Sequence, residues 1–60
     1  MTLEISLALM QKVKSNPSIL SIFRQSLATL YKSYRNELIS SSEYQTEYNN
    51  LLYKCSLLAE

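Results

Sequence analysis

The chain contains no glycine and a single proline, Pro17, so the places where a helix can be interrupted are few. Asn16 stands directly before this proline, and a capping Asn followed by Pro at the first helical position marks the start of a helix. A run of serines over 40–42 marks a second break, and Ser42 with Gln45 has the spacing of a capping box. These breaks predict helices over about 3–14, 17–40 and 43–59. No stretch alternates apolar and polar residues as a strand would.

Apolar residues recur every three or four positions within each predicted helix, a spacing that places them on one helical face. In chain order they are Leu3, Leu7, Met10 and Val13; Leu20, Phe23, Leu27, Leu30, Tyr34 and Leu38; and Tyr44, Tyr48, Leu51, Cys55 and Leu58, flanked by Leu52 and Ala59. The connection between the second and third helices is short, so these two should run antiparallel. The predicted fold is all-α: a short N-terminal helix followed by an antiparallel helical hairpin, in a single domain over 1–60.

Histidine, aspartate and glycine are all absent, which removes most catalytic and cofactor sites. Without histidine there is no imidazole for acid–base catalysis, and a lone cysteine cannot form a zinc site. Phosphate-binding loops need glycine, and calcium loops need aspartate. We therefore expect no enzyme activity, no catalytic residue, no cofactor and no metal.

The length of 60 residues predicts that the chain needs a partner. A domain of this size buries only about 60% of the surface that its unfolded chain exposes, and disulfides or metals usually compensate. This chain has one cysteine, which cannot form a disulfide within the chain, and no metal site is expected. A protein partner is therefore expected to stabilise it. No apolar run approaches the roughly 18 residues of a membrane span, and Glu4 stands where a secretory signal would be basic. We expect a cytoplasmic protein with no membrane association.

Some apolar residues fall outside the predicted core faces. At about 100° per residue, Ile5 and Leu9 point away from the Leu3/Leu7/Met10 face of the first helix. Ile22 lies off the apolar face of the second helix, and Tyr53 and Leu57 lie off that of the third. Paired apolar residues on two separate helices indicate a second, intermolecular surface. The predicted partner-binding residues are Ile5, Leu9, Ile22, Tyr53 and Leu57.

The remaining reactive or charged groups allow other interpretations. Cys55 lies on the apolar face of the third helix and is interpreted as a buried structural residue. Four tyrosines are expected to line the contact between the second and third helices: Tyr31, Tyr34, Tyr44 and Tyr48. Tyr31 with Lys32 and Arg35 could instead form a stacking and phosphate-binding patch for RNA, although two cations in one turn are more typical of a solvated face.

Two stretches of the second predicted helix carry a resemblance to a known family. Residues 23–27 read FRQSL and residues 35–38 read RNEL, and the opening residues 1–4 read MTLE. These segments resemble the small needle-subunit co-chaperones of type III secretion (the YscE-like family), with EYQ at 43–45 matching an aromatic residue flanked by polar ones. The resemblance covers most of the chain. The sequence departs from the family at the second break, where three serines replace a longer loop that often contains glycine.

This resemblance implies a cytoplasmic adaptor of virulence machinery. Such proteins pair as heterodimers with a helical-repeat chaperone, and the pair keeps the needle subunit monomeric until export. A weaker resemblance, from Asn16-Pro17 and the Tyr34-Arg35-Asn36 end of the helix, is to the type III needle subunits themselves. Those subunits continue as one long helix where this chain breaks at Ser40–Ser42.

The sequence thus predicts a non-enzymatic co-chaperone that acts by helix packing, in a homo- or hetero-oligomer with coiled-coil-like contacts. No small-molecule substrate is expected. Two alternatives stay open: a small RNA-binding or regulatory helical hairpin that forms a homodimer, and a needle-subunit-like structural protein. The RNA alternative depends on Lys32, Arg35 and the excess of basic residues between positions 10 and 36.

Overall fold

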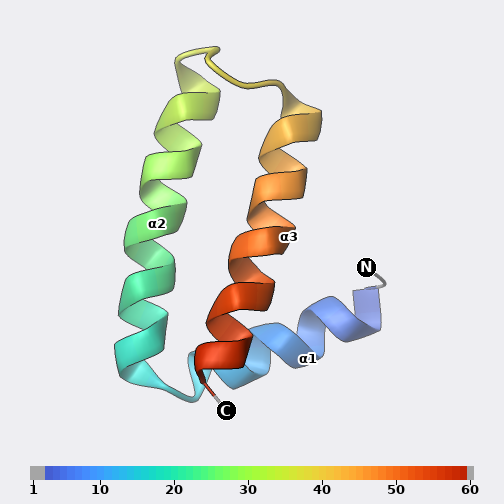
Figure 1. Ribbon diagram of the computed structural model, residues 1–60, viewed down its shortest axis with the longest axis vertical. Coiled ribbons are helices and arrows are strands. Elements are labelled where there is room, and N and C mark those ends of the chain that lie inside the picture. The colour runs from blue at the N-terminus through green and yellow to red at the C-terminus, as the bar shows by residue number, and fades with distance from the viewer. Residues whose placement is uncertain (1–2, 60) are drawn as a thin grey trace.

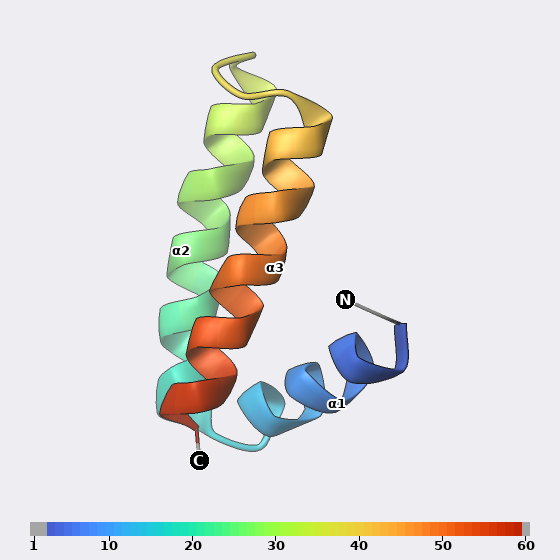
Figure 2. The ribbon, with the colours of Figure 1, turned by 45° about the vertical axis from the view of Figure 1, so that its right-hand side comes forward.

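The computed structural model describes residues 3–59, which form α1 (Leu3–Lys14), α2 (Pro17–Arg35) and α3 (Ser41–Leu58). No strand occurs within this range, so the predicted all-α class is confirmed. Figures 1 and 2 show α2 and α3 side by side and running in opposite directions. The first helix, α1, packs near the end where α2 begins and α3 finishes, contacts both, and extends away to one side. The molecule measures 33 × 24 × 12 Å.

The junction between α1 and α2 lies where the sequence predicts it. Asn16 adopts an extended backbone conformation, with φ of −120° and ψ of 100°. Its side-chain Oδ1 accepts a hydrogen bond from the backbone N–H of Ile19 at 3.3 Å. Pro17 occupies the first turn of α2, where its missing N–H costs nothing. The predicted bounds of the first helix are therefore confirmed.

The predicted end of α2 is wrong, because the helix stops at Arg35 and not at residue 40. The N–H of Glu37 donates to the carbonyl of Tyr34 at 3.1 Å, and that of Leu38 donates to the carbonyl of Ser33 at 3.0 Å. This pair of bonds is a Schellman motif, which usually has glycine in a left-handed conformation just past the helix. Here Glu37 takes that position, with φ of 60°. Because no glycine marks the site, the sequence gives no signal of the stop.

The predicted capping box of α3 is also wrong by two residues. Ser40 is the N-cap: its Oγ accepts from the N–H of Glu43 at 3.1 Å, and the N–H of Ser40 donates to Oε1 of Glu43 at 3.2 Å. Ser42 lies inside the helix, and Gln45 instead donates from Nε2 to Oδ1 of Asn49 at 3.2 Å. Glutamate at the third helical position bonds back to the N-cap and places a negative charge near the positive N-terminal end of the helix dipole. Both effects favour Ser40 over Ser42 as the N-cap.

Four apolar side chains form the buried core at the end of the molecule where all three helices meet. They are Val13, Phe23, Leu52 and Cys55, with Leu9, Met10, Ile19, Leu20, Leu27, Tyr48 and Leu51 packed partly buried around them. Ser56 is also buried, and its hydroxyl is satisfied by donating to the carbonyl of Tyr53 at 2.6 Å. Leu52, predicted to flank the core, is instead completely buried.

Four residues predicted for the core face are exposed: Leu7 at 56%, Tyr34 at 38%, Leu38 at 74% and Leu58 at 63%. Leu38 lies beyond the early end of α2. On α1 the buried face runs through Leu9, Met10 and Val13, which turns Leu7 outward. The side chain of Leu3, predicted to share that face, lies outside the described side chains.

Candidate partner-binding surfaces

The residues predicted for partner binding are mostly exposed. Ile5 is 52% exposed, Ile22 47%, Tyr53 53% and Leu57 51%. Leu9 differs, because it is half-buried and packs against the core cluster. The expectation that Leu9 points away from the core is therefore wrong, for the same reason that Leu7 is exposed: the buried face of α1 is centred on Val13.

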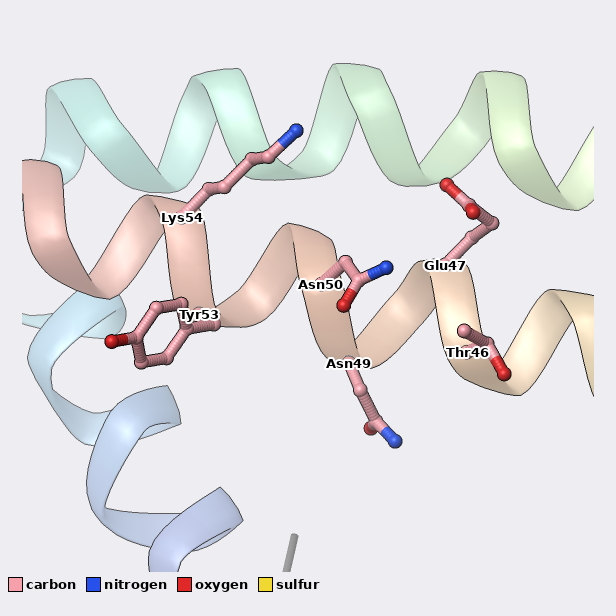
Figure 3. Close-up of a pocket in the computed structure, with 6 residues that line it drawn as sticks. All are labelled: Thr46, Glu47, Asn49, Asn50, Tyr53 and Lys54. Carbon is pink, nitrogen blue, oxygen red and sulfur yellow. The ribbon is translucent and has the colours of Figure 1, made fainter.

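These exposed residues do not form one continuous patch. Tyr53 and Leu57 lie one turn apart on α3, and Figure 3 shows the Tyr53 ring pointing toward α1. Ile5 lies on α1 itself. Ile22 lies on α2, one turn before Ser26, and Ser26 lines a groove that no residue of α1 lines. The structure thus places Ile5 on α1 and Tyr53 and Leu57 on α3, which we group as the α1–α3 surface, and Ile22 on a separate side of α2.

A shallow groove follows the line between α2 and α3. It consists of two connected hollows of about 190 and 410 Å³ that share Leu30 and Glu47. We call it the α2–α3 groove. Its lining residues are Ser26, Leu30 and Ser33 from α2, Ile39 from the turn, and Ser42, Glu43, Thr46, Glu47, Asn50, Leu51 and Lys54 from α3. The lining contains no residue of α1, so α1 does not cover this side of the helix pair.

A larger hollow of about 570 Å³ lies on the outside of α3, which supplies all six of its lining residues. In Figure 3 the side chains of Glu47 and Lys54 point toward the α2 side, Asn49 points away from it, and the Tyr53 ring lies toward α1. A hollow formed along a single helix has no facing groups to converge on a small substrate. This face of α3 lies between the α2–α3 groove and the α1–α3 surface and separates them.

The four tyrosines predicted to line the contact between α2 and α3 do so. Tyr34 and Tyr44 have ring centroids 5.0 Å apart, and Tyr31 approaches Tyr44 edge-on at 6.3 Å. Tyr48 continues the series, 6.4 Å from Tyr44 and 6.0 Å from Phe23. This tyrosine cluster links the core to the half of the helix pair nearest the turn. Each such aromatic pair contributes about 0.5–1.5 kcal/mol beyond simple burial.

Cys55 lies in the core and is 2% exposed. Desolvation by burial raises the pKa of its thiol, which favours the neutral thiol at physiological pH and disfavours a nucleophilic thiolate. The structural interpretation of Cys55 agrees with this environment. Within residues 3–59, no three side chains of the His, Cys, Asp or Glu types are grouped as metal ligands. In the same range, no helix combines the length and apolarity that crossing a bilayer requires.

Sequence reasoning missed two features of these surfaces. Ser56 is buried although serine is usually exposed, and only the neighbouring carbonyl of Tyr53 makes this possible. The α2–α3 groove was also missed. A signal for it exists in the two serines, Ser26 and Ser33, which stand seven residues apart on the same side of α2 as Leu30. Small side chains at such spacing leave a depression between larger neighbours.

No protein-family model matches this chain, and no curated protein or solved structure is similar enough to support an inference.

Proposed function

We propose that this protein is a non-enzymatic adaptor that binds a second protein chain by helix packing. The observation that carries the proposal is the exposure of large apolar side chains. The total exposed area, polar and apolar together, is 4522 Å², whereas a compact monomer of 6.9 kDa exposes about 4000 Å². Large side chains on all three helices contribute to this excess, each 47–63% exposed: Ile5, Leu7, Ile22, Tyr53, Leu57 and Leu58.

The α1–α3 surface is the proposed contact with the partner. The helices α1 and α3 pack against each other, and Tyr53 points toward α1 from the α3 side (Figure 3). Tyrosine is enriched among the residues that dominate binding energy, because its ring buries a large area and its hydroxyl stays hydrated. A groove between helices of the partner would fit this surface, since neighbouring helical turns present the anchors.

A more specific proposal comes from the sequence resemblance. The protein would act in the cytoplasm as a co-chaperone of type III secretion, with a helical-repeat chaperone as direct partner and the needle subunit as the protected client. The scaffold would be the short N-terminal helix followed by an antiparallel helical hairpin. Exposed apolar residues on both α1 and α3 support a protein partner, whereas the identity of that partner is supported by the resemblance alone.

Co-expression with candidate chaperone and needle proteins, followed by size-exclusion chromatography, tests this proposal. Wild-type protein should co-elute with the partner, and Tyr53→Glu or Leu57→Glu should abolish co-elution with helical circular dichroism unchanged. Leu38→Glu is the matched control, since Leu38 is 74% exposed but lies in the turn. If the Tyr53 and Leu57 variants bind as wild type does, the α1–α3 surface is not the interface.

Ile5 and Leu9 provide an internal comparison on α1. Ile5→Glu should weaken partner binding and keep the fold, because Ile5 is about half exposed. Leu9→Glu should instead lower the stability of the free protein, because Leu9 packs on the core cluster. Thermal unfolding of both variants separates the two roles.

RNA binding is the second candidate, favoured by the 50% exposure of Tyr31 next to exposed Lys32 and Arg35. Against it, the rings of Tyr31, Tyr34 and Tyr44 already contact one another, so fewer ring faces are available for bases. Retention of a single-stranded oligonucleotide that falls steeply with salt would support RNA binding. No retention at low salt would eliminate it.

A further inference from the structure

The α2–α3 groove is a second uncovered surface, distinct from the α1–α3 surface proposed for the partner. Leu30 and Leu51 are half-buried in it, and Ser26 and Ser33 line its α2 side. Small side chains let the backbone of another helix approach closely. The groove therefore combines two half-buried leucines with small side chains beside them, and its other lining residues are mostly polar.

One stripe of α3 borders this groove with an apolar residue between two opposite charges. Glu47, Leu51, Lys54 and Leu58 follow at spacings of four, three and four, which places them along one side of the helix. Glu47 and Lys54 both point toward the α2 side in Figure 3. Within residues 3–59 neither forms an ion pair. Seven residues of helix rise about 10 Å, so the acid and the base stand two turns apart.

This arrangement of charges is complementary to itself. If a second α3 runs antiparallel to the first, with a two-fold axis between Asn50 and Leu51, position 47 of each chain lies opposite position 54 of the other. Each Glu47 then meets a Lys54 on the second copy, and the pair occurs twice. Such reciprocity, in which one patch contacts its own copy, defines the interface of a two-fold dimer.

We propose that the occupant of the α2–α3 groove is a second copy of this chain, packed antiparallel along α3. Leu51 of each copy lies at the centre of the interface, and the exposed Leu58 lies near its ends, opposite position 43 of the other copy. Ile22, one turn from Ser26 on α2, lies on the same side and is covered as well. The dimer thus involves the exposed residues Ile22 and Leu58, which lie outside the α1–α3 surface.

Sedimentation equilibrium over a range of protein concentrations, at low salt, tests the dimer. The wild-type protein should change from monomer to dimer as its concentration rises. Glu47→Lys and Lys54→Glu should each weaken the dimer roughly ten-fold, because each replaces two attractive contacts by repulsive ones. Both side chains are exposed, so the variants should keep wild-type helicity by circular dichroism.

Two combinations make the test specific for the proposed pairing. The double variant E47K/K54E should recover the wild-type dissociation constant, because the pairs re-form with exchanged sign. An equimolar mixture of the two single variants should form a heterodimer that is stronger than either homodimer, since all four charges then match. A single variant that dimerises weakly because it is misfolded would not recover in either combination.

The proposal is overturned if the wild-type chain stays monomeric at every concentration, or if it dimerises and the double variant is no stronger than the single ones. Tyr53→Glu is the control that separates this proposal from the adaptor function. It should leave the dimer unchanged while it abolishes binding of another protein. Either proposal can therefore fail without the other.

Discussion

At the scale of single residues, the stability of this protein depends on very few side chains. Among residues 5–59, whose burial the structure describes, four apolar residues are buried, and Leu52 among them is completely inaccessible to solvent. We expect Leu52→Ala to cost about 2–5 kcal/mol, because it removes buried methyl groups and leaves a cavity. Leu38→Ala, at a site 74% exposed, should change stability by less than about 0.5 kcal/mol. Urea denaturation followed by circular dichroism measures both, and equal losses would contradict the described core.

The Cys55 thiol should make the protein less stable in alkali. Burial raises its pKa in the folded state, so the unfolded chain ionises at a lower pH than the folded one. This contribution is complete below the unfolded pKa of about 8.5 and is lost as pH rises through the folded pKa. Cys55→Ala should remove it, so that the variant loses less stability than wild type between about pH 7 and pH 10. Every other ionisable group is common to the two proteins, so the thiol alone distinguishes them in this comparison. Parallel pH profiles would show that the thiol is not desolvated.

At the scale of elements, the turn between α2 and α3 carries a local conformational cost. Glu37 has φ of 60°, which costs a residue with a Cβ atom about 1–2 kcal/mol relative to the right-handed region. Glu37→Gly should stabilise the protein by about 0.5–1 kcal/mol, the remainder being offset by the greater freedom of glycine in the unfolded chain. A rise in melting temperature with unchanged helicity is the expected readout. A lower melting temperature would mean that Glu37 is not left-handed in solution.

The start of α3 distinguishes the observed cap from the predicted one. Ser40→Ala removes the acceptor for the N–H of Glu43 and should cost about 1 kcal/mol. Ser42→Ala should have little effect, because Ser42 lies within the first turn and alanine is a good helix former. Thermal unfolding of the two variants decides between the caps. A larger loss at Ser42 would restore the sequence-based prediction.

At the scale of the whole molecule, the core lies at one end and the turn lies at the other. Near the turn, α2 and α3 are joined mainly by the tyrosine cluster, and α1 does not reach it (Figure 2). Regions with few buried apolar contacts open at lower free energy. Backbone amides of residues 28–35 and 44–47 should therefore exchange with deuterium faster than those of residues 20–27 and 50–58. Uniform protection along both helices, measured by NMR, would show that the molecule opens as one unit.

The sequence by itself determined the helical class, the first helix and the junction at Asn16-Pro17, because these depend on spacing and on local backbone chemistry. It also placed the tyrosines between α2 and α3, as the ring contacts confirm. The end of α2 could not be read from it, since a left-handed glutamate has no sequence signature.

Only the tertiary structure decided which apolar residues are buried. Helical periodicity predicts the direction of a helix's apolar side to within about one residue step of 100°. On α1, turning the buried side by about that angle brings Leu9 into the core and moves Leu7 out of it. The final choice depends on how α1 lies across the other two helices, which is a long-range property. The same packing leaves the α2–α3 groove open and places Glu47 and Lys54 along its edge. A pattern within one helix cannot specify a surface that two helices form together.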